Sequence, residues 1–165
     1  MILPGRSVVT RGIVSALREK ASQVQPCGVD LSLKRVLEWT GAGTIDFSNL
    51  HRQTAPTRVL PFADPDDRLH LPLGAYLVEF NERVCTPLDA MGQLFVRSSL
   101  FRSGALLSAG VCDAGYEGAV GGMLQVCNPF GITLHRDAKL AQFVFHQMME
   151  GVEGYSGVYQ GSKSL

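Results

Sequence analysis

The chain has 165 residues, of which 45% are hydrophobic, and its 15 Lys and Arg balance 15 Asp and Glu. This length suits one domain with a sizeable core, and 18 glycines and 8 prolines indicate a turn-rich β protein. A net charge of zero excludes an overall basic field for nucleic acid, so any phosphate site must be a local group of arginines.

The first predicted element is a helix over residues 8–20, because Val9, Ile13 and Leu17 recur at helical spacing. The short apolar runs that follow are separated by turns and are typical of strands. Residues 46–71 contain three prolines and the acidic cluster 64–67, and this predicts a long excursion over the surface. The predicted strands cover residues 29–37, 73–80, 91–96, 105–111, 121–127, 132–134 and 140–149.

Residues 151–165 are rich in Gly and Ser, which predicts a mobile tail or lid rather than core. The four cysteines show no Cys-x-x-Cys spacing, so we expect small buried apolar side chains rather than a zinc site or disulfides. No apolar run reaches membrane-spanning length, and the first residues lack a signal-peptide core. We therefore expect a cytoplasmic protein without a membrane or nucleic-acid partner.

One acidic side chain, Asp113, lies at a predicted turn between Gly110 and Gly115, three residues before Tyr116. Glycines let a ligand approach the backbone, a carboxylate can polarise a water, and an aromatic ring can pack on a sugar or base. The alternative is an ordinary β-turn, because Asp and Gly are the commonest turn residues.

The segment 97–104 brings two arginines and three serines directly after an apolar run. Hydroxyls and main-chain N–H groups at the start of a helix or turn bind phosphate oxygens, and Arg binds them bidentately. The alternative is a capped, solvated turn after a strand. Together with Asp113, this segment supplies what phosphoanhydride hydrolysis needs, which is positive charge for the phosphates and a carboxylate for the attacking water.

Five segments resemble, in order, the motifs of the dUTPase and dCTP deaminase superfamily, and the resemblance covers essentially the whole chain. It implies a single mainly β domain over residues 1–165, a distorted jelly-roll-like β-barrel with an N-terminal helix. It also implies a homotrimer, with the Arg-Ser-Ser segment of one subunit facing the Asp turn of a neighbour. The matching segments are 25–33, 97–104, 110–118, 139–145 and 154–161.

By the same resemblance, Asp113 would orient and deprotonate the water that attacks the α-phosphorus of dUTP, giving dUMP and pyrophosphate. Tyr116 would pack under the deoxyribose, and Asp30 would make a supporting hydrogen bond. A Mg²⁺ would bridge the phosphates through phosphate oxygens and water, with no protein ligand. The implied substrate-binding residues are Arg97, Ser98, Ser99, Arg102, Ala109, Gly110, Val111, Tyr116, Gln125, Gln142, Tyr155 and Lys163.

The superfamily also contains dCTP deaminases, which rely on a Glu about ten residues after the Asp to activate water. Counting back from Asn128, the equivalent here is Gln125, and counting forward from Asp113 it is Met123. Neither can serve as a base. The pair at 121–122 resembles an insertion relative to the deaminases, and either alignment lacks the carboxylate.

Ala109 followed by Gly110 also resembles the dUTPase pattern, in which main-chain groups lie against the edge of uracil. The zinc-dependent deaminase signature is absent from the sequence. The tail resembles the deaminase ending, but the Lys of that ending is Val158 here, and Lys163 is the candidate to replace its charge. Alternatives to a dUTP pyrophosphatase are a dCTP deaminase, possibly a bifunctional one, a non-catalytic nucleotide-binding member, and a β-barrel interaction domain.

Overall fold

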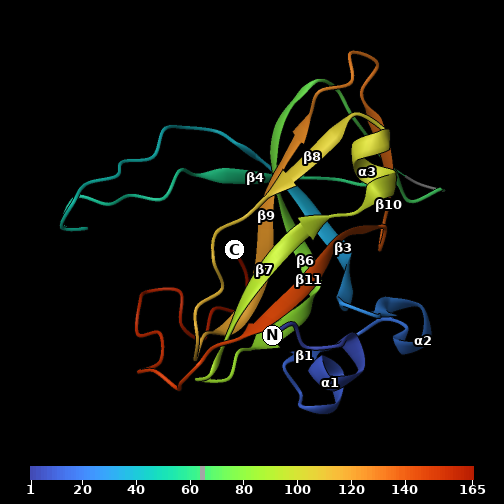
Figure 1. Cartoon of the computed structure of the whole chain (residues 1–165). Coiled ribbons are helices and arrows are strands. Elements are labelled where there is room, and N and C mark those ends of the chain that lie inside the picture. The colour runs from blue at the N-terminus through green and yellow to red at the C-terminus, as the bar shows by residue number, and fades with distance from the viewer. Residues whose placement is uncertain (64–65) are drawn as a thin grey trace.

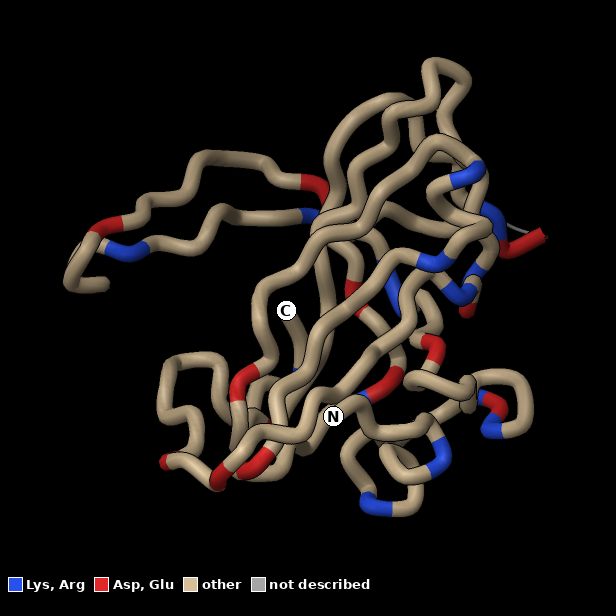
Figure 2. The backbone as a smooth tube through the Cα atoms, in the orientation of Figure 1, with Lys and Arg blue, Asp and Glu red and all other residues tan. Residues whose placement is uncertain are grey.

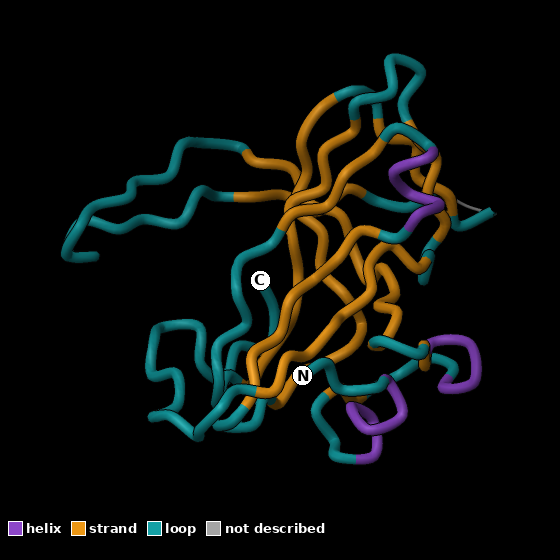
Figure 3. Tube along the Cα trace, in the orientation of Figure 1, coloured by secondary structure: helices purple, strands orange, loops and turns teal. Residues whose placement is uncertain are grey.

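The computed structural model describes residues 1–63 and 66–165. The fold is mainly β, as predicted, with short helices at the margins of a continuous twisted sheet (Figures 1 and 3). Within the described residues, nine strands belong to the main sheet and two others pair separately. None of the helices there is long and apolar enough to cross a membrane.

The main sheet is antiparallel and curls into a nearly closed barrel. Its two edge strands, β7 and β8, are joined through the single-turn helix α3 (Ser98–Arg102), which brings the two edges together. Each strand along the path overlaps a range predicted from the short apolar runs between turns. In order across the sheet they are β7 (Ala90–Val96), β11 (Lys139–Gln147), β3 (Gly28–Trp39), β6 (Gly74–Cys85), β9 (Glu117–Val126) and β8 (Ala105–Ser108).

The core lies inside this curled sheet. Large apolar side chains from β3, β6 and β11 are almost completely removed from water, among them Leu31, Leu33, Phe80, Phe143 and Phe145. Phe143 and Phe145 pack with their ring centroids 4.5 Å apart. Gly92 on β7 makes room for them, because a Cβ there would lie 2.7 Å from the Phe143 ring. The small residue at this position therefore lets β7 close over the aromatic core.

The predicted helix over residues 8–20 is wrong in its bounds. Helix α1 (Gly5–Thr10) follows Pro4 and ends before Gly12, which adopts a φ of +71°. The chain then extends as β1 (Val14–Ser15), which pairs with β6. Ile13 and Val14 are buried as part of this extended segment, so their apolar spacing reflects contact with the sheet rather than a helical face. Helix α2 (Lys20–Gln23) and strand β2 (Val24–Gln25) complete this region.

The predicted surface excursion over residues 46–71 is partly structured. Residues 40–56 form an arm that projects from the barrel (Figure 1). Strand β4 (Thr57–Leu60) pairs with β3, and β5 (Arg68–Leu71) pairs with β10 (Ile132–His135). Both strands were missed because they are only four residues long, most of their residues are exposed, and neither forms an apolar run like those from which the other strands are predicted. Residues 64 and 65 of the acidic cluster lie outside the described residues.

The expectation that the cysteines are buried is wrong for three of the four. Cys27, Cys85 and Cys127 are exposed, and Cys112 is half-buried. Cysteine is among the residue types most often buried in proteins. These three, however, lie at strand ends or in the segments that follow them, where the backbone reaches the surface.

Charge is unevenly distributed even though the net charge is zero. Figure 2 shows several Lys and Arg around α3 and the adjoining ends of β7 and β11, whereas Asp and Glu predominate at the opposite end of the sheet. A local basic region is therefore present at the place where the sequence predicts phosphate binding.

Candidate active site

A cavity of about 500 Å³ opens beside the connection between β8 and β9. Its wall combines the backbone of Ala109, Gly110 and Val111 with the side chains of Asp113 and Tyr116. Asp113 is the only acidic residue that lines this cavity among those the structure describes. The predicted carboxylate site is therefore a hollow of suitable size for a nucleoside, with mainly apolar walls.

A turn holds the carboxylate at the cavity mouth. Tyr116 N–H donates to the carbonyl of Asp113 at 3.2 Å, and Gly115 adopts a φ of +76°. Cys112, just before the turn, pairs with Gly92 of β7 through two main-chain hydrogen bonds. The turn is thus fastened to the barrel on both sides, and the exposed Asp113 side chain projects from a fixed backbone.

Tyr116 forms one side of the cavity. Its hydroxyl donates to the carbonyl of Ala119 at 2.8 Å, and its ring meets the edge of Tyr155 with centroids 5.7 Å apart. Burial is the main cause that raises the pKa of Tyr116 above its ordinary value. Burial also raises the pKa of the neighbouring Cys112 thiol to about 11. Both groups are therefore neutral at physiological pH, and Asp113 supplies the charge on this wall.

The tail crosses the cavity along the start of β9. Gly161 N–H donates to the carbonyl of Glu117 at 2.8 Å, and Ala119 N–H donates to the carbonyl of Ser162 at 2.9 Å. Leu165 fills the space above Gly121, where a Cβ would lie 1.9 Å from its Cδ1. The backbone N–H of Leu165 donates to the Glu79 carboxylate at 3.2 Å. The last residues thus lie against the barrel, and their mobility stays a prediction.

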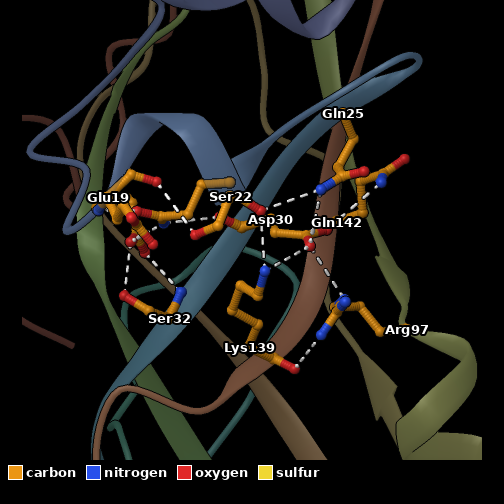
Figure 4. A network of polar contacts seen from close by, with 10 residues as sticks. Glu19, Ser22, Gln25, Asp30, Ser32, Arg97, Lys139 and Gln142 are labelled. Atoms are coloured by element: carbon orange, nitrogen blue, oxygen red, sulfur yellow. Dashed lines mark hydrogen bonds and ion pairs between the residues drawn. The ribbon is translucent and has the colours of Figure 1, made fainter.

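A second, smaller cavity of about 270 Å³ contains the predicted phosphate-binding side chains. Arg97, Ser98 and Gln142 line it, together with Gln25 and Asp30. Figure 4 shows Gln25, Asp30, Arg97 and Gln142 converging from β2, β3, the junction between β7 and α3, and β11. Gln25 has no role among the sequence predictions, although it opens the first matched motif.

The two cavities lie on opposite faces of the ribbon formed by β7 and β11. In this ribbon Leu94 pairs with Phe143, and Phe95 pairs with Gln142. Leu94 and Phe143 line the Asp113 cavity, whereas Phe95 and Gln142 line the Arg97 cavity. Because successive side chains of a strand point to opposite faces, one chain presents Asp113 and Arg97 on different sides of this ribbon.

The structure therefore separates the predicted site residues into three groups. The first group lines the Asp113 cavity and the second lines the Arg97 cavity. The third group lines neither: Ser99 and Arg102 are exposed on α3, Gln125 is exposed on β9, and Lys163 is exposed in the tail. The first group comprises Ala109, Gly110, Val111, Asp113, Tyr116 and Tyr155, and the second comprises Arg97, Ser98 and Gln142.

Gln125, a predicted substrate-binding residue, lines neither cavity, and its contact with substrate stays a prediction. It pairs with Ala75 on one side and Leu106 on the other, close to the end of β9 that lies away from the Asp113 cavity. Met123 is 41% exposed and also lies outside the cavity lining. Neither candidate equivalent of the deaminase Glu thus lines the Asp113 cavity, and neither Met nor Gln is a base.

The chain is similar to several archaeal proteins along most of its length. A protein of Methanosarcina acetivorans named a probable deoxyuridine 5'-triphosphate nucleotidohydrolase is 42% identical over 144 residues, 87% of this chain and 84% of that protein. A deoxyuridine 5'-triphosphate nucleotidohydrolase of Methanocaldococcus jannaschii is 36% identical, covering 84% of this chain and 88% of its own length. A probable enzyme of the same name from Aeropyrum pernix is 35% identical and covers 98% of both chains.

Solved structures show the same fold. The dCTP deaminase of Agrobacterium tumefaciens superposes with a TM-score of 0.63 at 22% identity, covering 87% of this chain and 47% of the deaminase. The dUTPase of Streptococcus mutans gives a TM-score of 0.51 at 15% identity, covering 86% of this chain and 98% of that enzyme. The model of the dCTP deaminase-like family matches residues 6–148. The chain belongs to this family, which confirms the resemblance seen in the sequence.

Proposed function

We propose that the protein is a dUTP pyrophosphatase, which converts dUTP and water to dUMP and pyrophosphate. The observation that carries the proposal is the Asp113 cavity, in which one carboxylate faces a mainly apolar hollow among the described residues. Such a site can activate one water for attack on a phosphorus, but it offers no second carboxylate for deamination of a ring carbon. The names of the archaeal relatives support the same reaction.

In this proposal the Asp113 carboxylate accepts a proton from the water that attacks the α-phosphorus. The bond between the α-phosphorus and its bridging oxygen breaks, and pyrophosphate leaves. Tyr116 packs beneath the deoxyribose, while main-chain groups of Gly110 face the uracil edge. A uracil O4 accepts and its N3–H donates, which is the reverse of cytosine at these two positions, so fixed main-chain groups favour one base over the other.

The phosphates would be held by Arg97, Ser98 and Gln142. Because these residues lie on the other face of the β7–β11 ribbon, a complete site needs the Arg97 cavity of a second copy of the chain. The geometry supports the homotrimer that the resemblance implies, with each site shared between neighbours. The proposed substrate is a nucleotide made inside the cell, and we accordingly place the enzyme in the cytoplasm.

We also propose that Mg²⁺ binds together with the triphosphate, through phosphate oxygens and water. The described residues contain no group of three or more His, Cys, Asp or Glu that could hold a metal ion by themselves. The side chains present suit an ion that is carried by phosphate oxygens and water, with Asp113 and Asp30 as the nearest acidic groups. When bound, the ion would neutralise charge on the phosphates.

Product analysis with two substrates tests the proposal. The purified protein is incubated with Mg²⁺ and either dUTP or dCTP, and the products are separated by chromatography. We expect dUMP and pyrophosphate from dUTP and no deaminated product from dCTP. Appearance of dUTP or dUMP from dCTP would assign a deaminase or a bifunctional enzyme instead. Tight binding of dUTP without any turnover would assign the non-catalytic alternative.

A further inference from the structure

Asp30 is a buried carboxylate at the centre of the Arg97 cavity. It is 1% exposed and lies on β3, where polar side chains from three other segments meet it (Figure 4). Arg97 Nε lies 3.1 Å from its Oδ2. Gln25 Nε2 donates to Oδ2 and Gln142 Nε2 donates to Oδ1, both at 3.4 Å. One carboxylate thus contacts three of the polar side chains that line this cavity.

A fourth donor, Lys139, reaches Asp30 because β11 is irregular. Its Nζ lies 3.7 Å from Oδ2 and donates to the carbonyl of Ser22 at 2.8 Å. Lys139 and Gln142 are three positions apart, so a regular strand would direct them to opposite faces. The pairing of β11 with β3 shifts register between Lys139 and Ala141. This extra residue places both side chains beside Asp30, which is how bulges redirect side chains in functional sites.

The guanidinium of Arg97 is held at two of its three nitrogens. Its Nε faces Asp30, and its Nη1 donates to the carbonyl of Lys139 at 3.1 Å. Nη2 has no hydrogen-bond partner among the described residues. A guanidinium carries five N–H groups in one plane, so fixing two of its nitrogens also sets the direction of the third. The Nη2 group is available to an oxyanion in the cavity.

The charges around Asp30 favour an anionic ligand. Arg97 and Lys139 contribute two positive charges against the single negative charge of Asp30, so a net charge of +1 remains. We propose that Asp30 is a positioning residue, which aligns Arg97 and Gln142 so that the phosphates meet a preset array of donors. This inference rests on the proposed cleavage of a triphosphate and adds the residue that organises the phosphate half of the site.

Glu82 provides a matched control on a neighbouring part of the same network. It is also 1% exposed, and it accepts hydrogen bonds from Gln23 Nε2 at 2.6 Å and from Ser32 N at 2.8 Å. Neither of these partners lines the Arg97 cavity. Removing the charge of Glu82 should therefore affect folding stability without affecting phosphate binding.

Calorimetric titration with pyrophosphate at fixed ionic strength tests the role of Asp30. For Asp30→Asn we expect affinity to fall by about ten- to a hundredfold, the loss of one charge-assisted hydrogen bond. The KM for dUTP should rise in parallel, with a smaller change in kcat, while binding of deoxyuridine should be unchanged. For Glu82→Gln we expect a lower melting temperature and wild-type pyrophosphate affinity.

The direction of the change in pyrophosphate affinity distinguishes a positioning role of Asp30 from a purely electrostatic one. Removing the Asp30 carboxylate raises the local charge, so electrostatics alone predicts tighter binding of pyrophosphate. Unchanged or tighter binding by Asp30→Asn would overturn the proposal. Equal weakening by Asp30→Asn and Glu82→Gln would also overturn it, because the effect would then be general destabilisation.

A second variant keeps the test decisive if Asp30→Asn does not fold. Arg97→Lys retains the charge but cannot bind Asp30, the Lys139 carbonyl and a ligand in one plane. We expect it to weaken pyrophosphate binding as much as Asp30→Asn, and the double variant to weaken it no further. Wild-type affinity in Arg97→Lys would contradict the proposal. The two proposals can fail separately. If the variants lose pyrophosphate binding but the wild-type protein does not cleave dUTP, the proposed function is wrong and the positioning role of Asp30 stands.

Discussion

Asp113 and Arg97 line cavities on opposite faces of the same pair of strands, β7 and β11. The two strands form an antiparallel ribbon. Along it, the paired residues Leu94 and Phe143 face one side, and the next pair, Phe95 and Gln142, faces the other. A single nucleotide cannot contact both residues through this ribbon. In the proposed reaction, the residue that would activate water and those that would hold phosphate therefore meet only when two copies of the chain associate.

Replacement of Asp113 by Asn should abolish turnover and preserve binding. The side chain is exposed at the cavity mouth, so the change disturbs no buried contact. Asn keeps the shape but cannot accept the proton, and we expect kcat to fall by about a hundredfold or more. Steady-state kinetics and calorimetry with a non-hydrolysable dUTP analogue measure the two effects. Full activity in this variant would remove Asp113 from the mechanism.

Gly110 offers a test of base recognition that does not disturb the fold. No described heavy atom lies within 4 Å of a Cβ built at this position, so Gly110→Ala should melt at the wild-type temperature. The added methyl group would stand between the main chain and the edge of the base, and we expect the KM for dUTP to rise by about tenfold. Gly151→Ala is the control for kinetics, because Gly151 lines neither cavity and a Cβ there would lie 3.9 Å from the carbonyl oxygen of Leu88. An unchanged KM in Gly110→Ala would place the base elsewhere.

Glu79 links stability to pH. Burial raises the pKa of this fully buried carboxyl, but hydrogen bonds from Lys34 and Arg35 outweigh burial and leave the pKa below its ordinary 4.5. A group with a lower pKa in the folded state stabilises the fold above its unfolded pKa, and this contribution is lost as the pH falls through the folded pKa.

Urea unfolding at pH 7 and pH 4 measures this contribution. At pH 7, Glu79→Gln should lower the free energy of unfolding by about 2 kcal/mol, because two cations lose a charged partner. At pH 4 and below, the difference between the wild type and the variant should shrink. A difference that stays constant with pH would show that the charge of Glu79 does not stabilise the fold.

The tail should contribute more to catalysis than to folding. Tyr155 and Tyr159 line the Asp113 cavity, and Arg52 of the arm lies 5.6 Å from the Tyr159 ring centroid. Deleting residues 152–165 removes these walls but leaves the core strands in place, so kcat/KM should fall sharply while the melting temperature changes little. If the truncated protein kept full activity, the tail would be dispensable, and if it failed to fold, the tail would be a structural strap.

Short apolar runs between turns predicted the long strands of the barrel, and the matched motifs contain Asp113 and Arg97, which line the two cavities. The short elements were harder. Ile13 and Val14 have the spacing of a helical face, yet Gly12 ends the helix and the sheet buries them as an extended segment. Strands β4 and β5 carry little apolar signal because most of their residues face water.

Which predicted site residues line which of the two cavities could not be predicted from the residues alone. Whether Arg97 and Asp113 share a face depends on strand register, and counting along the chain does not give register. The same limitation applies to Gln125, which was chosen by counting back from Asn128 and pairs with Leu106 outside both cavities. It also explains Lys139, whose place beside Asp30 depends on an irregularity between two paired strands.

Mixing two inactive variants tests the shared site most directly. Asp113→Asn and Arg97→Ala chains are unfolded together, refolded at equal concentration, and assayed for release of pyrophosphate from dUTP. If each site draws these residues from two different subunits, about a quarter of the sites in a random mixture regain both, and activity should return to about a quarter of the wild-type value. Activity no greater than the average of the two variants, or a protein that remains monomeric in light scattering, would contradict the account.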